Sequence, residues 1–431
     1  MSIAETCRNI KSAAIKLAAC STDIKNSALA KIAQALEAHK EEIFRANRVD
    51  LERSEAENVP MPLLKRLKFD EHKLGDVISG INSLIRLEDP VGKTLSSTEL
   101  DEGLELYKVT CPIGVIGIIF ESRPDALVQI STLCLKSGNA VLLKGGSEAI
   151  ETNRVLARII ISASEEAGLP KGWCSLLETR SEITELLKQD QYVDLIIPRG
   201  SNEFVRFIME NTKIPVMGHA DGICHCYIDS SADPEMALRI AIDSKTQYVA
   251  VCNAIETLLV HRDLAELFLP MLKKAADEKN VELFGCSETA AVIDVSPATE
   301  ETWKTEYLDY KLSVRVVGRL EEAIDHINTY GSGHTDTIVT NNRDNAARFM
   351  SLVDSGSVFW NCSTRFNDGF RYGLGAEVGI STGKLHARGP VGLEGLVIYK
   401  YMLLGDGQIV ADYAEKRRAF THRKLYKDFF L

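Results

Sequence analysis

The sequence predicts an α/β protein with two doubly wound domains and a small β extension. Short runs rich in Val, Ile and Leu alternate with segments of helical periodicity from about residue 113 to residue 390. Strands that are apolar almost throughout, and that are separated by single helices, form parallel sheets covered on both faces. A chain of 431 residues is too long for one ordinary core and is expected to hold two or three domains.

Composition narrows the class of protein. Lys and Arg number 50 and Asp and Glu 61, and the resulting net charge of −11 argues against nucleic acid or an anionic membrane as the main partner. The most apolar stretch, 112–120, is too short to span a membrane, and the N-terminus has no apolar signal core. Ten cysteines without an export signal predict reduced thiols and a cytoplasmic protein, so a special cysteine is expected to be a nucleophile or a ligand.

Elements follow in chain order from these periodicities. Apolar residues at spacings of three and four predict a helix over 3–17 and a second one, capped by Ser21 or Thr22, whose apolar stripe reaches Ile43. Six strands are expected in the first parallel sheet, at 115–120, 140–144, 174–177, 193–198, 214–217 and 226–229. Helices between them are expected to start near Pro124, Ser147, Glu182 and Ser201. This alternation is typical of a nucleotide-binding domain.

A second alternating block follows. A helix at 234–243, a loop at 244–253, a strand at 257–261, a helix at 264–278 and a strand at 281–284 predict another α/β domain. The segments 104–110 and 396–402 mix apolar and polar residues, as exposed strands do, and they could add to the sheet edge of another subunit. We therefore expect a first domain from 1–98 and 112–243, a second from 244–395, a β extension from 99–111 and 396–431, and a homo-oligomer.

Cys252 is the first candidate for chemistry, because its loop joins the two predicted domains. A thiolate attacks a carbonyl carbon and forms a thioester that can accept hydride. Most free cysteines are small buried hydrophobic residues, and from its position alone this alternative stays open.

Two strand ends carry candidate anion sites. Lys144 ends a strand and is followed by GGSEA, which opens a helix whose N-terminus favours anions. Arg199, Gly200 and Ser201 follow another strand end. Two such ends in one parallel sheet are consistent with a dinucleotide. Ordinary turns, with Ser201 as a plain N-cap, remain the alternative.

Other polar clusters are less specific. His219, Cys224, His225 and Cys226 have a spacing that is poor for zinc, so no metal site is expected. Arg365 and Arg371 lie in a Gly-rich polar stretch, and Arg123 follows a strand in FESRPD. Each is either an anion-binding group or part of a solvated turn.

At these same residues the sequence resembles the γ-glutamyl phosphate reductases, also called glutamate-5-semialdehyde dehydrogenases, a branch of the aldehyde dehydrogenase superfamily. The matching strings are PIGVIGIIFESRPD (112–125), KSGNAVLLKGG (136–146), PRGSN (198–202), GHADGICH (218–225), CNAIETLLVH (252–261), STRFNDGFRYGLGAEVGIST (363–382) and HARGPVGLEGL (386–396). They cover nearly the whole chain in order. The resemblance implies an aldehyde-dehydrogenase-like fold: a cofactor domain, a catalytic domain and a β extension used in oligomerisation.

The resemblance also implies a reaction. L-glutamyl 5-phosphate would be reduced by NADPH to L-glutamate 5-semialdehyde and phosphate, the second step from glutamate toward proline, through a thioester on Cys252. Alternatives are a hydrolytic aldehyde dehydrogenase and a catalytically silent binding protein. The region VMGHADGICH lacks the Glu that serves hydrolytic members as base, which disfavours the first. An intact Cys252 disfavours the second. A separate glutamate kinase is a conceivable partner, because the acyl phosphate is labile.

The resemblance also assigns cofactor-binding roles to individual residues. By this resemblance Lys144 contacts the adenosine ribose or its phosphate, Gly200 and Ser201 lie near the pyrophosphate, and Glu306 holds the nicotinamide ribose. NAD-preferring members often have an acid three residues after the lysine. Here Ser147 stands at that position, which favours NADP(H) because a carboxylate would repel a 2′-phosphate.

Catalytic and substrate residues complete the expected site. The oxyanion donors are expected among the Cys252 backbone N–H, the Asn253 side chain and Ser122, which stands nearest the place of the superfamily's oxyanion Asn. Arg123, Arg365 and Arg371 are expected to contact the substrate carboxylate or phosphate. The histidines His219 and His386 are expected to help with phosphate.

Overall fold

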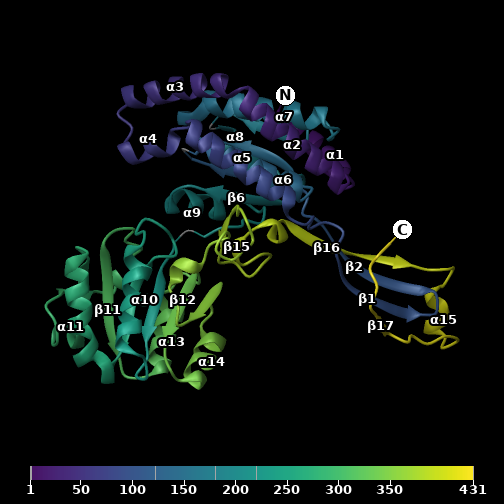
Figure 1. Ribbon diagram of the computed structural model, residues 1–431. Helices are drawn as coiled ribbons and strands as arrows, with labels where there is room; N and C mark the ends of the chain where they lie inside the picture. The colour runs from purple at the N-terminus through teal and green to yellow at the C-terminus, as the bar shows by residue number, and fades with distance from the viewer. Residues whose placement is uncertain (1, 122, 180, 220, 431) are drawn as a thin grey trace.

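The computed structural model describes residues 2–121, 123–179, 181–219 and 221–430. Three parts are visible in Figure 1: a helix-rich α/β part that contains the N-terminus, a second α/β part, and a β extension that projects away from both. Among the described residues, no helix combines the length and apolar composition that a bilayer crossing requires. All ten cysteines are free thiols.

Five helices open the chain; the first packs against the first sheet, and the others pack mainly on one another and on the helices that cover this sheet. They are α1 (Ile3–Leu17), α2 (Thr22–Ala38), α3 (Lys40–Ala56), α4 (Met61–Leu67) and α5 (Glu71–Arg86). Ser2 and Ser21 accept hydrogen bonds from backbone N–H groups in the first turns of α1 and α2, which confirms the expected starts. The expected single helix up to Ile43 is wrong: His39 leaves the helical conformation (φ −103°, ψ 16°), and the chain breaks into α2 and α3 there.

The first sheet has four parallel strands in the order β5-β4-β3-β6. Its strands are β3 (Val115–Phe120), β4 (Ala140–Lys144), β5 (Cys174–Leu177) and β6 (Leu195–Arg199), and its helices are α6 (Pro124–Lys136), α7 (Ile150–Glu166), α8 (Ser181–Leu186) and α9 (Asn202–Glu210). One apolar core joins α2, α6 and α7 to one face, and another joins α1 to the opposite face. The strand expected at 214–217 is wrong: only a bridge between Ile196 and Val216 forms there.

The second sheet has seven strands in the order β10-β9-β11-β8-β7-β12-β13. Its strands are β7 (Cys224–Ile228), β8 (Ile255–His261), β9 (Glu282–Gly285), β10 (Ser296–Pro297), β11 (Lys311–Val317), β12 (Thr335–Val339) and β13 (Ser357–Trp360). Its helices are α10 (Pro234–Thr246), α11 (Arg262–Glu278), α12 (Ser287–Ala290), α13 (Leu320–Tyr330) and α14 (Arg343–Leu352). All pairs are parallel.

One strand lies in a different sheet from the one predicted. The strand expected at 226–229 was placed in the first sheet, but β7 pairs with β8 and β12 in the second. The first domain therefore does not extend to residue 243, because β7 and α10 pack in the core of the second sheet. Buried strands have the same apolar pattern in either sheet, so periodicity alone could not predict that the chain crosses to the second sheet before β7.

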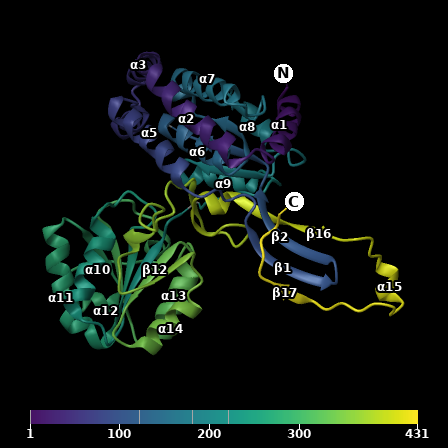
Figure 2. The same cartoon turned by 45° about the vertical axis from the view of Figure 1, so that its right-hand side comes forward.

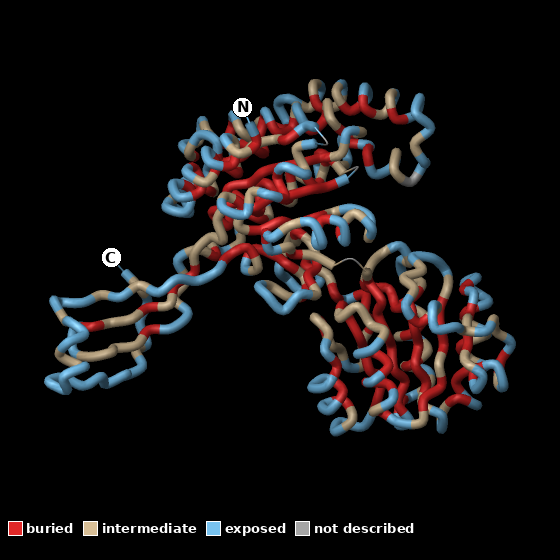
Figure 3. Tube along the Cα trace, turned by 180° about the vertical axis from the view of Figure 1, so that it is seen from behind, coloured by how far each residue is buried: buried red, intermediate tan, exposed pale blue. Residues whose placement is uncertain are grey.

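The β extension is a four-stranded antiparallel sheet in the order β16-β2-β1-β17. Its strands are β1 (Thr94–Asp101), β2 (Leu104–Pro112), β16 (Val397–Leu404) and β17 (Arg423–Leu425), with the short helix α15 (Val410–Ala414) between the last two. Strands at 104–110 and 396–402 are confirmed, and β16 is exposed as expected, but the expected exposure of 104–110 is wrong because β2 lies between β16 and β1 and has no exposed residue. β1 starts five residues before the predicted boundary at 99. Figure 2 shows this sheet standing clear of both α/β parts, and in Figure 3 it is mostly exposed or intermediate.

Candidate active site

A cavity of about 300 Å³ lies where the two α/β parts meet. The end of β6 and the start of α9 form one wall, and the turn before β8 contributes Cys252 and Asn253. The segment after β13, which includes a two-stranded ribbon of β14 (Gly379–Ser381) and β15 (Gly389–Val391), closes the rest. The predicted junction of two domains is therefore a real concavity.

Local packing fixes the position of Cys252. It lies in the turn between α10 and β8, where its carbonyl oxygen accepts a hydrogen bond from Cys224 Sγ (3.1 Å). A Cβ atom at Gly222 would collide with the Cys252 backbone, so only glycine permits this approach. The buried pair of Lys245 Nζ and Glu256 Oε2 (2.5 Å) joins the end of α10 to the start of β8 and so holds both ends of the turn.

The environment of Cys252 disfavours its thiolate. Burial, reinforced by the Glu306 carboxylate, raises the pKa of the thiol to about 12, although the Arg199 guanidinium acts in the opposite direction. The resting nucleophile is therefore a neutral thiol, and a base must take its proton when the substrate is bound.

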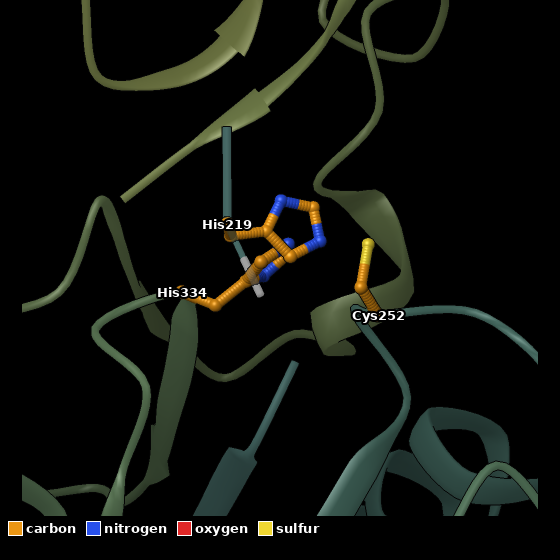
Figure 4. A group of neighbouring side chains, drawn as sticks. All are labelled: His219, Cys252 and His334. Carbon is orange, nitrogen blue, oxygen red and sulfur yellow. The ribbon is translucent and has the colours of Figure 1, made fainter. Parts of the chain in front are cut away.

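Two histidines lie beside Cys252. The sulfur and one ring nitrogen from each of His219 and His334 are within 4.8 Å of one another. In Figure 4 the His219 ring turns its outer nitrogen, Nε2, toward the sulfur, and His334 lies behind that ring. His219 Nδ1 is 2.8 Å from the Ile380 carbonyl oxygen. Because a carbonyl only accepts hydrogen bonds, Nδ1 carries the hydrogen and Nε2 has a free lone pair.

Burial keeps both imidazoles neutral. It lowers the pKa of His219, and the nearby Arg199 guanidinium lowers it further. It lowers the pKa of His334 well below its usual value. A neutral His219 with a free Nε2 is in the right protonation state to accept a proton.

Glu306 lies in the site, although its role as a ribose ligand stays a prediction. One carboxylate oxygen accepts a hydrogen bond from Asn202 Nδ2 (2.6 Å) and the other from the Gly222 backbone N–H (2.9 Å). Burial raises its pKa. Asn202 opens α9, so Glu306 connects the second α/β part to the first beside the nucleophile.

The cofactor candidates lie at neighbouring strand ends of the first sheet. Lys144 ends β4 opposite Ile119, and Arg199 ends β6 opposite Phe120 on the shared neighbour β3. Ser147 starts a 3₁₀ turn before α7 and is exposed. Gly200 lines the cavity. Ser201 caps α9 by accepting a hydrogen bond from the Phe204 N–H (3.4 Å), so the N-cap proposed as the alternative for this residue is present. The N-terminus of α9 nevertheless lies at the edge of the cavity.

The expected substrate arginines separate into two groups. Arg365 is buried, lines the cavity and donates from Nε to Gln247 Oε1 (2.9 Å). Arg123 pairs with Asp125 (3.0 Å) outside the residues that line this cavity. Arg371 pairs with Asp368 (3.4 Å) and is also absent from the lining.

The remaining candidates are Asn253, His386 and Ser122, and only Asn253 lines the cavity among the described residues. Asn253 donates one amide hydrogen to the Asn367 carbonyl oxygen (2.8 Å). His386 is exposed and lines a different cavity. Ser122 lies outside the described residues, so its expected oxyanion role stays a prediction.

Arg199, which was expected in an anion site at a strand end, lines the cavity and donates to the Val378 carbonyl oxygen (2.6 Å). Three lining or neighbouring groups were not among the predicted site residues. Glu377 and Asn367 come from the Gly-rich stretch that supplied Arg365. His334 had no signal, because it precedes an ordinary buried strand.

Comparison with known proteins agrees with this geometry. The model of the aldehyde dehydrogenase family matches residues 2–300. The gamma-glutamyl phosphate reductase of Acetivibrio thermocellus is 71% identical over 429 residues, which is 100% of each chain. That of Pelotomaculum thermopropionicum is 70% identical over 429 residues, covering 100% of this chain and 99% of its own. The crystal structure of gamma-glutamyl phosphate reductase from Thermotoga maritima, 40% identical, covers 95% of this chain and 100% of its own, with a TM-score of 0.93.

Fold, nucleophile and comparisons together define the class: the chain belongs to the aldehyde dehydrogenase family and is an oxidoreductase. Enzymes of this family use NAD(P). Within the family, the chain belongs with the gamma-glutamyl phosphate reductases.

Proposed function

We propose that the chain reduces L-glutamyl 5-phosphate to L-glutamate 5-semialdehyde and phosphate with NADPH, the second step from glutamate toward proline. The observation that carries this proposal is the Cys252 thiol beside a neutral His219 in a cavity that also holds two guanidinium groups. The names of the relatives supply the substrate. The site supplies a nucleophile, a base and cations for a phosphate.

Acyl transfer starts with His219. Its free Nε2 takes the Cys252 proton as the sulfur attacks the acyl carbon. The bond between that carbon and the phosphate oxygen then breaks and leaves a thioester. His219 gives its proton to the departing phosphate, which leaves as hydrogen phosphate, so one imidazole serves as base and then acid. Arg365 and Arg199 stabilise the negative charge of the departing phosphate.

The cofactor fits the aligned strand ends. Lys144 and Ser201 stand on either side of β3 at the same edge of the parallel sheet, where such sheets bind dinucleotides. Lys144, Ser147, Gly200 and Ser201 would hold the phosphates and adenosine, and Glu306 the nicotinamide ribose. When bound, NADPH supplies the hydride that reduces the thioester carbon. As the carbon–sulfur bond breaks, Cys252 leaves as a thiolate and regains a proton from solvent through His219.

The nearby carboxylates are poorly placed to activate water. Both oxygens of Glu306 accept hydrogen bonds, and Glu377 accepts one from the Gly369 N–H (2.9 Å). A thioester on Cys252 therefore persists until hydride arrives. This favours the phosphate-releasing reductase over a hydrolytic aldehyde dehydrogenase.

We also infer a cytoplasmic homo-oligomer built through the β extension. β16 is an edge strand whose eight residues pair on one side only, with β2. Ile398, Tyr399, Tyr401 and Leu403 on it are 36–62% exposed. A long apolar edge strand is covered in stable proteins, and a second copy offers the complementary edge.

The reverse reaction tests the function. Glutamate 5-semialdehyde and NADP⁺ are supplied with and without inorganic phosphate, and NADPH formation is followed by absorbance, with Cys252→Ala as control. We expect NADPH only when both phosphate and Cys252 are present. NADPH formation without phosphate would mean that water cleaves the thioester, and the hydrolytic alternative would replace the proposal.

A further inference from the structure

The structure assigns a second property to the active-site cavity: we propose that Cys252, His219 and His334 form a binding site for a thiophilic divalent cation, with Zn²⁺ as the prime occupant. The three ligand atoms come from three separate segments and lie within 4.8 Å of one another (Figure 4). One thiolate and two imidazoles are a donor set that suits Zn²⁺. The proposal does not depend on which acyl group the enzyme reduces.

Geometry permits closure around an ion. With Zn–S near 2.3 Å and Zn–N near 2.0–2.1 Å, tetrahedral ligand atoms stand about 3.4–3.6 Å apart. The largest separation here, up to 4.8 Å, exceeds that by about 1.2–1.4 Å, which a small rotation of the side chains covers. The fourth position faces the cavity, where water or a substrate oxygen has room.

Each imidazole already has the second contact that metal ligands need. His219 Nδ1 is held by the Ile380 carbonyl (2.8 Å), which leaves Nε2 free as donor to a metal. His334 Nδ1 is 2.8 Å from Thr335 Oγ1. These contacts fix ring orientation and lower the entropy cost of binding.

His334 supplies an independent observation. It is fully buried, yet its Nε2 has no hydrogen-bond partner among the described residues. A buried polar nitrogen without a partner destabilises the folded protein. A metal ion bound at this nitrogen would remove that cost, and His334 is not needed for the acyl-transfer steps proposed above.

Charge around the site is mixed. The Glu306 and Glu377 carboxylates attract a cation, and the buried Arg199 and Arg365 guanidinium groups oppose it. Binding replaces the thiol proton by the metal, so the ion and the acyl substrate exclude each other. Zn²⁺ is thus expected to act as a reversible inhibitor competitive with the acyl phosphate.

The test uses Co²⁺ and Zn²⁺ on the full chain after chelator treatment. We expect one Co²⁺ per chain with a near-ultraviolet thiolate-to-metal absorption band, absent in Cys252→Ser and after iodoacetamide has alkylated Cys252. Saturating Zn²⁺ should slow alkylation of Cys252 by at least about tenfold, measured by mass spectrometry, while the half-buried Cys286 and Cys362 react as before. A chelator should restore the rate.

Two variants make the test specific. His334→Asn keeps an amide N–H donor toward Thr335 Oγ1 but removes Nε2, and we expect Zn²⁺ affinity to fall at least about tenfold. His326→Asn is the matched control, because the buried His326 also has an Nε2 without a partner among the described residues but lies outside the proposed ligand set, so affinity should not change. A cobalt band that survives Cys252→Ser, or unchanged alkylation of wild-type Cys252 under saturating Zn²⁺, would overturn the proposal without touching the proposed reaction.

Discussion

His219→Gln is the most informative change to the proposed mechanism. The substitution removes the imidazole lone pair that faces Cys252, while the glutamine amide can still donate to the Ile380 carbonyl. A thiol with a pKa of about 12 is ionised in only about one molecule in 10⁵ at pH 7. A positioned base typically contributes 10²–10⁴-fold, so we expect kcat to fall by about that factor with KM changed only a few fold.

The pH profile gives the sign of the effect. Burial lowers the pKa of His219, so the neutral base is present at pH 7 and is lost only as pH falls through that lowered pKa. The wild-type rate should therefore be flat near neutrality and decline in acid. In the variant the rate depends on free thiolate and should rise about tenfold per pH unit until the thiol ionises.

The assay combines NADPH oxidation with the acyl phosphate and the rate of iodoacetamide labelling at Cys252, both against pH. His386→Gln is the matched control, because that histidine is exposed and lines another cavity. It should behave as wild type. A His219→Gln enzyme that retains kcat within threefold and keeps the wild-type pH profile would refute the base assignment.

Three further predictions concern stability, substrate binding and assembly. Lys245→Met leaves Glu256 buried without its partner, and urea unfolding should show a loss of about 3–5 kcal/mol, partly restored when Glu256→Gln is added. Arg365→Ala should raise KM for the acyl phosphate about tenfold or more and leave KM for NADPH nearly unchanged. Arg371→Ala removes a group outside the cavity lining and should raise KM for the acyl phosphate less. A larger effect of Arg371→Ala in steady-state kinetics would contradict this assignment. The double variant Tyr401→Glu and Leu403→Glu places two charges on the exposed edge strand β16. Light scattering should show that the oligomer dissociates into smaller species. An unchanged mass of the oligomer would exclude this edge as the interface.

Much of the fold followed from the sequence because its signals are local. The apolar runs at 115–120 and 140–144, and the helix cap at Ser21, depend on neighbours in the chain and are confirmed. Sheet membership is not local. β7 has the same apolar pattern as β3, and only its pairing with β8 and β12 places it in the second sheet.

The site residues show the same difference between local signals, which the sequence carries, and long-range contacts, which it does not. Cys252 could be selected because its loop position and its residue type both point to nucleophilic chemistry. The resemblance added Glu306, which accepts a hydrogen bond from the cavity-lining Asn202 but is not itself a lining residue. The expected help of His219 with the phosphate stays a prediction, and the ring faces the Cys252 sulfur, which was not foreseen. That orientation depends on the Ile380 carbonyl, 161 residues away in sequence, and no pattern along the chain reports such a contact.

The unfavourable environment of Cys252 has a chemical advantage. A permanently ionised cysteine would react with any electrophile that enters the cavity, whereas a thiol whose pKa is about 12 reacts only when an adjacent base accepts its proton. The same burial that raises this pKa lowers that of His219, so the pair shares one proton and neither group is charged at rest. The phosphate of the substrate is the acceptor that finally removes this proton. Acyl transfer is thus coupled to the arrival of a phosphorylated substrate.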